Sequence, residues 1–248
     1  MELVEGVEIV SELPVLYIRK YKALVLADTH IGFEEEMADK GIFIPRFQLR
    51  KLLDILSLSL TATNVSEVII AGDFKHRFSG LGKIERKELS IVLEYLLSKV
   101  DKVVVVRGNH DNYLPLLQKK FDFVITNEYL LGNEYLIIHG HKLPQTEGNW
   151  RYLIMGHEHP SISLRDSLGT IGKFSCFLVG PLSNGRTLIT LPAVGAYQTG
   201  SKVTLDRDTY LSPVIKELAI IEQLRPIIID EEAGLLELPT LSELWDMI

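Results

Sequence analysis

Five short apolar segments of this sequence each end in a cluster of polar residues, and this repeated pattern limits the folds open to the chain. The clearest segment is 103–106, four consecutive valines, which is followed by Arg107-Gly108-Asn109-His110-Asp111. A run of β-branched residues is typical of a strand buried on both faces. Polar residues that follow such strands gather at the carboxyl edge of an α/β sheet, where ligands bind.

The other four segments repeat this arrangement. They are 23–27 before Asp28-Thr29-His30, 68–71 before Gly72-Asp73, 135–138 before His139-Gly140-His141, and 152–155 before Gly156-His157-Glu158-His159. Six of the seven histidines lie in these clusters, and none follows the last cluster. We therefore expect five strands to direct polar side chains to one edge of the fold.

Two amphipathic helices are predicted between the first three of these strands. Apolar residues recur at helical spacing over 45–60, with Pro45 in the first turn, and again over 84–100. Each helix returns the chain to the next buried strand, which makes two β-α-β units. Such units favour a parallel central sheet with right-handed crossovers.

Shorter elements are predicted on both sides of these units. Residues 7–28 fit two antiparallel edge strands that lead into the strand 23–27, and 113–120 fits a short helix. Further strands are predicted over 122–126, 129–131, 134–138, 174–179 and 187–191. Because no long helix interrupts the segment from 169 to 205, we expect a second sheet that packs on the first.

Length and charge place few limits on function. A chain of 248 residues can bury one substantial core, so we expect a single domain over 1–248. Residues 211–248 show the weakest pattern, with strands possible at 219–221 and 227–229 and a terminal helix at 241–248, and we expect a peripheral C-terminal extension. The net charge is −7, but the last nineteen residues hold six acids and no basic residue, and the rest of the chain carries −1. Global charge therefore neither favours nor excludes a polyanionic partner.

The single cysteine, Cys176, excludes an intrachain disulfide, and its apolar neighbours predict a buried core residue. The N-terminus carries acids where a secretory signal carries basic residues. No apolar run approaches the roughly eighteen residues of a membrane helix. We therefore expect a cytoplasmic protein with no membrane partner.

The polar clusters contain the donor atoms of a metal site. Asp28 and His30 are two residues apart, and on an extended chain that spacing sends both side chains to one side. An isolated cluster of this kind can also be a strand-end turn with an Asx hydrogen bond, and Gly72-Asp73 can be a tight turn. The Gly-rich loop 74–83 lacks a dinucleotide or P-loop fingerprint, which argues against a nucleotide-binding fold.

Taken in order, the five clusters resemble the signature of the calcineurin-like metallophosphoesterase superfamily. The resemblance implies an α/β fold in which two β-sheets form a sandwich flanked by helices, in four layers. It also implies a centre of two metal ions. One ion would be held by Asp28, His30 and His159, the second by Asn109, His139 and His157, and Asp73 would bridge both.

The implied ligands are nitrogen and oxygen donors with no thiolate. Such a set fits Mn²⁺, Fe²⁺ or Zn²⁺ better than Mg²⁺ or Ca²⁺, which prefer oxygen alone, and we expect Mn²⁺. The two carboxylates only partly neutralise two divalent ions, so the site keeps a positive charge that attracts a phosphate ester. The ions would lower the pKa of bound water and neutralise charge on the phosphoryl oxygens.

The resemblance makes His110 the general acid that protonates the departing alkoxide, with Asp111 orienting its ring. A histidine suits this role because its reference pKa of roughly 6.5 permits donation and recovery near neutral pH. The alternative is a histidine that only packs at the strand end. His141 is expected to contact substrate or support a metal ligand, Arg107 is a candidate for substrate binding, and His76 is expected to have a surface role.

The whole chain also resembles a narrower archaeal and bacterial group, related to the nuclease subunits of DNA double-strand-break processing complexes and encoded in some lineages beside DNA ligase or helicase genes. The residues that carry this resemblance lie in 27–34, 107–111, 156–160 and 191–193. After them, Val194-Gly195-Ala196-Tyr197 replaces the Asn- and Gly-rich stretch usual in the group. The resemblance implies a phosphodiesterase or nuclease of DNA or RNA, with repair proteins as partners.

Two further functions stay open at this stage. The spacing of the clusters leaves no room for a long capping insertion, which suits an extended substrate, but basic residues interleaved with aromatic ones are sparse. A small-molecule phosphatase acting on a cyclic nucleotide or a phosphomonoester would use the same chemistry. An inactive binding platform would have lost ligands, and none is lost here.

Overall fold

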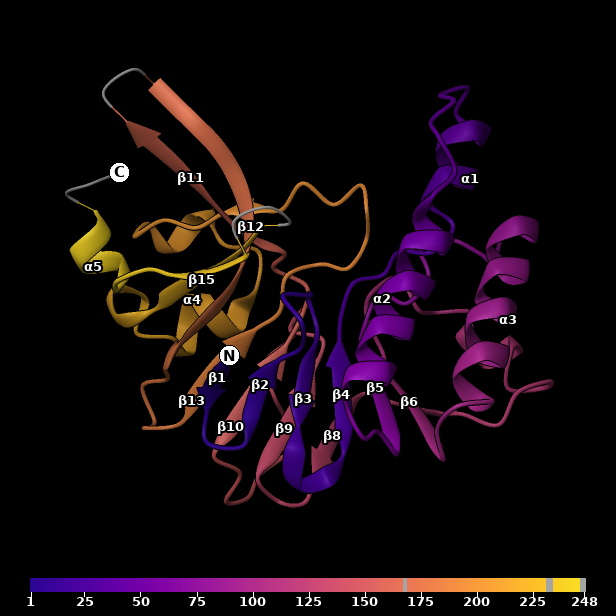
Figure 1. Ribbon diagram of the computed structural model, residues 1–248, viewed down its shortest axis with the longest axis horizontal. Coiled ribbons are helices and arrows are strands. Elements are labelled where there is room, and N and C mark those ends of the chain that lie inside the picture. The colour runs from indigo at the N-terminus through magenta and orange to yellow at the C-terminus, as the bar shows by residue number, and fades with distance from the viewer. Residues whose placement is uncertain (167–168, 231–233, 246–248) are drawn as a thin grey trace.

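Two β-sheets lie against each other in the centre of the structure, a computed structural model that describes residues 1–166, 169–230 and 234–245 (Figure 1). Helices cover the outer faces, so the predicted four-layer α/β sandwich is confirmed. Among the described residues, no helix has the length and apolar character needed to cross a membrane.

The first sheet has seven strands that follow one another in chain order. They are β1 (Glu2–Val4), β2 (Val7–Ile9), β3 (Leu16–Ile18), β4 (Ala23–Leu26), β5 (Glu67–Ala71), β6 (Lys102–Val106) and β7 (Val124–Thr126). Strands β1 to β4 form an antiparallel meander, and β4 to β7 run parallel. The predicted parallel unit is therefore confirmed, and β1 extends the two predicted edge strands.

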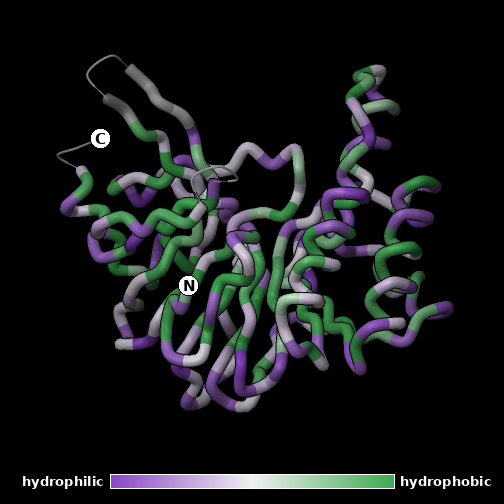
Figure 2. The backbone as a smooth tube through the Cα atoms, in the orientation of Figure 1, coloured by the Kyte–Doolittle hydropathy of each residue, from purple (hydrophilic) through white to green (hydrophobic). Residues whose placement is uncertain are grey.

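Two long helices, α2 (Gln48–Ala62) and α3 (Lys83–Leu97), pack their apolar faces on this sheet. Helix α2 begins three residues later than Pro45, because the Glu34 carboxylate in α1 (Phe33–Asp39) accepts the backbone N–H groups of Phe47 and Gln48. The apolar spacing predicted over 45–60 is correct within α2, whereas the apolar residue Phe47 lies before the helix and is 42% exposed. Figure 2 shows hydrophobic and hydrophilic residues alternating along both helices.

The second sheet has nine strands and forms the other layer. They are β8 (Glu128–Leu131), β9 (Tyr135–Ile138), β10 (Tyr152–Met155), β11 (Pro160–Asp166), β12 (Gly169–Pro181), β13 (Thr187–Thr190), β14 (Ser201–Lys202), β15 (Arg225–Asp230) and β16 (Gly234–Glu237). Strands β9, β10 and β13 are parallel at its centre. The predicted helix over 113–120 is only a 3₁₀ turn, Leu114–Leu116.

The C-terminal elements cover the outer face of the second sheet (Figure 1). They include α4 (Pro213–Leu218) and α5 (Leu241–Leu244), both packed over an apolar cluster that contains Cys176, which is buried as predicted. The strand expected at 227–229 is present in β15, whereas 219–221 leads into a 3₁₀ turn, Ile221–Gln223. Residues 246–248 of the predicted terminal helix lie outside the described residues.

Strand β4 shows how the layers are built. Leu24 and Leu26 face α2 and α3, while Ala23 and Val25 face the second sheet. Because side chains alternate along a strand, both faces are buried and the run must be apolar throughout. The strand end is then the first place where polar groups can appear, and the ends of β4, β5, β6, β9 and β10 meet.

Candidate metal centre

The structure brings all seven predicted metal ligands to one site at these strand ends. Asp28 and His30 follow β4, Asp73 follows β5, Asn109 follows β6, His139 follows β9, and His157 and His159 follow β10. The donors meet at one edge as predicted, but they come from both sheets, because β9 and β10 belong to the second sheet.

Asp28, His30 and His159 form the first group of donors. Their ligand atoms lie within 4.8 Å of one another. Oδ1 of Asp28 and Nε2 of both histidines are buried and make no hydrogen bond to the described residues. A buried polar atom without a partner is costly, and most such atoms in folded proteins are satisfied. Three of them aimed at one point fit a bound cation.

Asp73, His139 and His157 form the second group, whose ligand atoms also lie within 4.8 Å of one another. Oδ1 of Asn109 lies 3.0 Å from Nε2 of His139 and adds a further donor. Nδ1 of His139 donates to the carbonyl of Ala71 at 3.1 Å. That hydrogen bond orients the ring so that Nε2 points toward Asn109 and Asp73, an arrangement common among histidine ligands.

Asp73 belongs to the second group and also faces the first. Its Oδ2 is 3.4 Å from Nε2 of His139 and 3.8 Å from Nε2 of His30, while Oδ1 accepts the backbone N–H of His110 at 3.0 Å. One carboxylate can therefore serve both groups. The complete set consists of imidazole nitrogens, one amide and two carboxylates, which fits the divalent transition metals.

Burial and neighbouring charges lower the pKa of some histidines of the site and raise that of His139. Burial lowers the pKa of His30 to about 3 and that of His157 to about 4, so both are neutral and able to bind a cation at pH 7. Burial also opposes charge on His139, but the hydrogen bond and charge of Asp73 override it and raise its pKa to about 9. The same pairing holds the pKa of Asp73 below its ordinary value despite burial.

The backbone at the site is unusual. Five of the seven residues have positive φ: Asp28 (56°), His30 (45°), Asp73 (46°), His157 (67°) and His159 (47°). Such angles are uncommon outside glycine and store strain at functional sites. The extended backbone expected at Asp28 and His30 is therefore wrong, although both side chains do reach one site. Their N–H groups donate to the carbonyls of Gly72 and Asp73, which sets the loop conformation.

Glycines next to the donors make this close packing possible. A Cβ atom at Gly108 would overlap Oδ1 of Asp73, and one at Gly156 would overlap Oδ2 of Asp28. Both positions lack φ strain of their own, so the reason for glycine is space. The glycines in the sequence clusters are thus part of the site's geometry.

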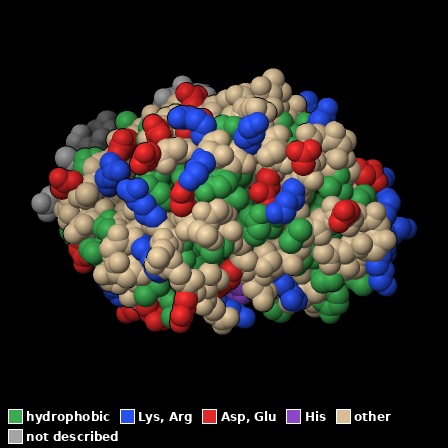
Figure 3. Space-filling model, turned by 90° about the horizontal axis from the view of Figure 1, so that it is seen from below, with side chains coloured by type: hydrophobic (Ala, Val, Ile, Leu, Met, Phe, Trp, Pro, Cys, Tyr) green, Lys and Arg blue, Asp and Glu red, His purple; other side chains and the backbone are tan. Residues whose placement is uncertain are grey.

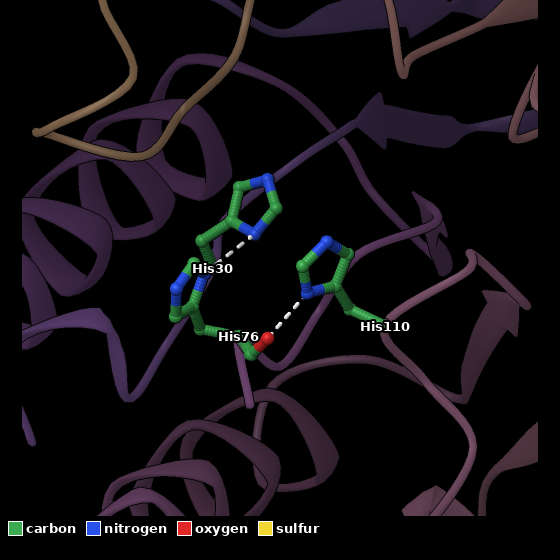
Figure 4. Close-up of side chains that lie close together, drawn as sticks. All are labelled: His30, His76 and His110. Atoms are coloured by element: carbon green, nitrogen blue, oxygen red, sulfur yellow. Dashed lines mark hydrogen bonds between the residues drawn. The ribbon is translucent and has the colours of Figure 1, made fainter. Parts of the chain in front are cut away.

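His110 lies beside the two groups, with Nε2 4.0 Å from Oδ2 of Asp73. Its Nδ1 donates to the backbone carbonyl of His76, which orients the ring (Figure 4). The contact expected from Asp111 is different: its buried carboxylate accepts the backbone N–H groups of Gly108 and Lys75. Burial raises the pKa of Asp111 to about 6. Asp111 therefore holds the loop that carries His110, and the ring takes its orientation from another residue.

His76 is the residue that the sequence interpretation missed, since its side chain is only 14% exposed. Nδ1 of His76 lies 3.2 Å from Nδ1 of His30, and its ring stacks on that of His110 with centroids 5.3 Å apart (Figure 4). Its Nε2 is 3.6 Å from a carboxylate oxygen of Glu36. His30, His76 and His110 also form a cluster of three mutually close histidines. The only sequence signal was its position three residues after Asp73.

Arg107 and His141 lie at the edge of the site. Both line a cavity that adjoins Asn109 and His139. The guanidinium of Arg107 donates to Oδ1 of Asn112 at 3.1 Å. His141 packs its ring 5.2 Å from that of His139, and its buried Nδ1 has no hydrogen-bond partner among the described residues.

A known protein family matches this sequence, and a solved structure of similar fold covers most of the chain. The family model of the calcineurin-like phosphoesterases matches residues 21–167, which contain all seven donors. The crystal structure of the nuclease MPE from Pseudomonas putida is similar over 96% of this chain and 98% of its own, with 21% identity and a TM-score of 0.64. The protein of unknown function AQ665 from Aquifex aeolicus shares 20% identity over 54% of this chain and 77% of its own, with a TM-score of 0.36. A search of curated proteins found no match.

Proposed function

This chain belongs to the calcineurin-like phosphoesterase family, and we propose that it is a dinuclear metal-dependent phosphodiesterase that cleaves nucleic-acid strands. The observation that carries the proposal is the pair of donor groups on either side of Asp73, with His110 beside them. Membership of the family supports a metal-dependent hydrolase. The nuclease activity, the two ions and their identity as Mn²⁺ are our proposals.

The ligand roles follow the two donor groups. Asp28, His30 and His159 would hold one cation, Asn109, His139 and His157 the second, and Asp73 both. Divalent cations bound there supply an activated water molecule and neutralise the charge that grows on the phosphoryl oxygens. The three buried donor atoms without hydrogen bonds support this assignment.

His110 is suited to donate a proton to the departing oxygen. Its Nδ1 already donates to the carbonyl of His76, so Nε2 is the nitrogen that can hand a proton to the substrate. The backbone N–H of His110 also donates to Asp73, which ties the acid to the carboxylate shared by both donor groups. Asp111 keeps this loop in place through its two backbone contacts.

His76 would position a ligand as well as the acid. If Nε2 of His30 binds a cation, Nδ1 of His30 must carry the proton and donate it to Nδ1 of His76. The proton of His76 then sits on Nε2, which faces the carboxylate of Glu36. This chain of contacts fixes the tautomer and the ring plane of His30.

A polynucleotide is the substrate that we propose, because the described site is not covered by an inserted domain. Only 28 residues separate His110 from His139 in the sequence. The nuclease of Pseudomonas putida supports the proposal through its fold. We also propose that the protein acts in nucleic-acid processing or repair, with repair proteins as partners, in the cytoplasm.

The proposal is tested by metal analysis and a substrate panel. Elemental analysis of the protein after incubation with Mn²⁺ and gel filtration should find two ions per chain. The loaded enzyme should hydrolyse bis-p-nitrophenyl phosphate and a single-stranded oligonucleotide faster than p-nitrophenyl phosphate. His110→Ala should keep both ions and lose about 10²- to 10⁴-fold in turnover.

Each arm of this test can fail separately. A single ion per chain would overturn the dinuclear site, and preference for the monoester would favour the small-molecule phosphatase. Full turnover by His110→Ala with both ions bound would remove His110 from the role of acid. No hydrolysis of either diester by the loaded wild type would overturn the proposed phosphodiesterase.

A further inference from the structure

A cavity of about 430 Å³ adjoins the second donor group. Asn109 and His139 form its inner wall, so a molecule in the cavity would lie against the reacting centre. Its volume is in the range of pockets that bind small organic ligands. The cavity extends beyond these two donors to Phe78, Arg107 and Lys142.

The charges that line the cavity favour an anion. Arg107 and Lys142 bring two positive charges, and the hydrogen bond from Arg107 to Asn112 holds its guanidinium in place. The only acid in the lining, Glu128, already accepts the backbone N–H groups of Gln145 and Thr146. A phosphate group in the cavity would therefore meet two cations and one carboxylate that is already engaged.

An aromatic ring completes the wall. Phe78 is 57% exposed, and its ring meets that of His110 edge to face, with centroids 5.7 Å apart. It lies in the loop that also carries His76, outside the three apolar clusters of the fold. An exposed aromatic face beside basic side chains is the arrangement on which nucleic-acid bases stack.

We propose that this cavity binds one unpaired nucleotide of a single-stranded nucleic acid, next to the phosphodiester that is cleaved. The base stacks on Phe78, and the phosphate on the far side of that nucleotide contacts Arg107 and Lys142. This inference rests on the proposed function, and it names the substrate class of the same site. A base in a duplex is excluded because its faces are covered by its neighbours.

Charge away from the cavity offers a nucleic-acid strand little general attraction. On the face shown in Figure 3, basic and acidic side chains are interspersed and neither sign dominates. The net charge of −7 also gives no general attraction for a polyanion. Affinity for a strand must then come from a few positions beside the reacting centre.

The test compares two phosphodiesters on the Mn²⁺-loaded enzyme, oligothymidylate and bis-p-nitrophenyl phosphate. The second lacks a base, a sugar and a neighbouring phosphate, so the ratio of the two kcat/KM values reports recognition of the nucleotide. Phe78→Ala should lower this ratio about ten-fold through a raised KM for oligothymidylate, and Phe78→Trp should restore it. Arg107→Gln should lower the ratio and also weaken its dependence on salt.

Matched control variants lie outside the cavity. Phe43→Ala removes an aromatic ring that is 86% exposed, and Arg50→Gln removes an exposed arginine on α2. Both should keep the wild-type ratio. In addition, oligothymidylate annealed to oligoadenylate should be cleaved at least ten-fold more slowly than the single strand.

Several results would overturn the inference while leaving the phosphodiesterase intact. These are an unchanged ratio in both Phe78→Ala and Arg107→Gln, equal cleavage of single strand and duplex, or hydrolysis of bis-p-nitrophenyl phosphate with no cleavage of oligothymidylate. A wild-type enzyme inactive on both diesters would instead overturn the proposed function.

Discussion

The two halves of the metal centre are held in place by different parts of the chain. The first half-site comprises Asp28, His30, Asp73 and Asn109 on loops of the first sheet, and the second half-site comprises His139, His157 and His159 on loops of the second sheet. Buried Glu85 supports the first half-site, because its carboxylate accepts the backbone N–H groups of His76 and Arg77. These contacts span fewer than ten residues.

The second half-site depends on a distant segment. Buried Glu158, between His157 and His159, accepts the N–H groups of Leu211 and Ser212, more than fifty residues further along the chain. The hydroxyl of Ser212 donates to the carbonyl of Gly140 at 2.7 Å. The segment expected to be peripheral thus begins with residues that hold the ligand loops. Two fully buried carboxylates, Glu85 and Glu158, thus organise the site, one through local and the other through long-range contacts.

The largest predicted effect tests whether the two donor groups, which each draw on both half-sites, share one carboxylate. Asp73→Ala should lose both metal ions and all measurable turnover, because Asp73 lies between the donor groups. His159→Ala should lose one ion and keep the other, since His159 belongs to the first donor group alone. Elemental analysis measures both. One ion retained in Asp73→Ala would show that the groups are independent.

The next effect concerns the support of a single ligand in each half-site. His76→Ala should weaken metal binding or turnover about 10- to 100-fold, because the hydrogen bond to His30 is lost. His141→Ala is the matched variant in the second half-site and should have a smaller effect on metal affinity, because Nδ1 of His141 has no partner among the described residues. Calorimetric titration with Mn²⁺ measures the metal affinity of both variants, and hydrolysis of bis-p-nitrophenyl phosphate measures their turnover. Equal losses would contradict the positioning role of His76.

The two supporting carboxylates can be compared directly by stability. Glu85→Gln and Glu158→Gln each exchange a carboxylate for an amide with only one acceptor oxygen, and each should lower the free energy of unfolding by about 1–3 kcal/mol. Urea unfolding of the metal-free proteins measures this loss. If only Glu85→Gln is destabilised, the contact of Glu158 with the C-terminal segment does not hold the second half-site.

The smallest effect tests a half-buried acid, Glu88, on the helices that cover the first sheet. Glu88 lies on α3 near carboxylates of α1, where burial and the charge of Glu34 raise its pKa to about 7. The folded state then binds a proton more tightly than the unfolded state, so stability falls as pH rises from about 4.5 through 7. Glu88→Gln should be more stable than wild type at pH 8, on the order of 1 kcal/mol for a half-buried group, and equal at pH 4.5.

Thermal unfolding at the two pH values measures this difference. Glu217→Gln, an exposed glutamate on α4, is the control and should change stability little at either pH. A Glu88→Gln variant that is less stable than wild type at pH 8 would contradict the predicted sign.

Local patterns explain what could be predicted. The valine run of β6 needs two buried faces, and its polar continuation must emerge at the strand end, so Asn109 and His110 were located without a structure. The two long helices were also predicted from a local pattern, since apolar residues at helical spacing identify the face that packs on the sheet. The start of α2 was missed because the carboxylate of Glu34, which caps it, lies thirteen residues before Phe47.

The features that were missed depend on contacts between loops. The extended backbone predicted at Asp28 and His30 gave way to left-handed conformations, because their N–H groups pair with the loop after β5. The orientation of the His110 ring comes from the main-chain carbonyl of His76. Every residue has such a carbonyl, so the sequence does not indicate which one the ring contacts. His76 was assigned to the surface because its contacts with His30 and His110 form only when the loops after three different strands meet.

By itself, the sequence determined which residues stand at the ends of five buried strands, because burial is encoded by runs of apolar residues a few positions long. The tertiary structure alone decided which donors face one another and what holds them. The N–H of His157 donates to Asp28 across 129 residues, and that contact exists only once the two sheets have packed. The sequence specifies which donor atoms are available, whereas the packing of the two sheets sets the distances between them.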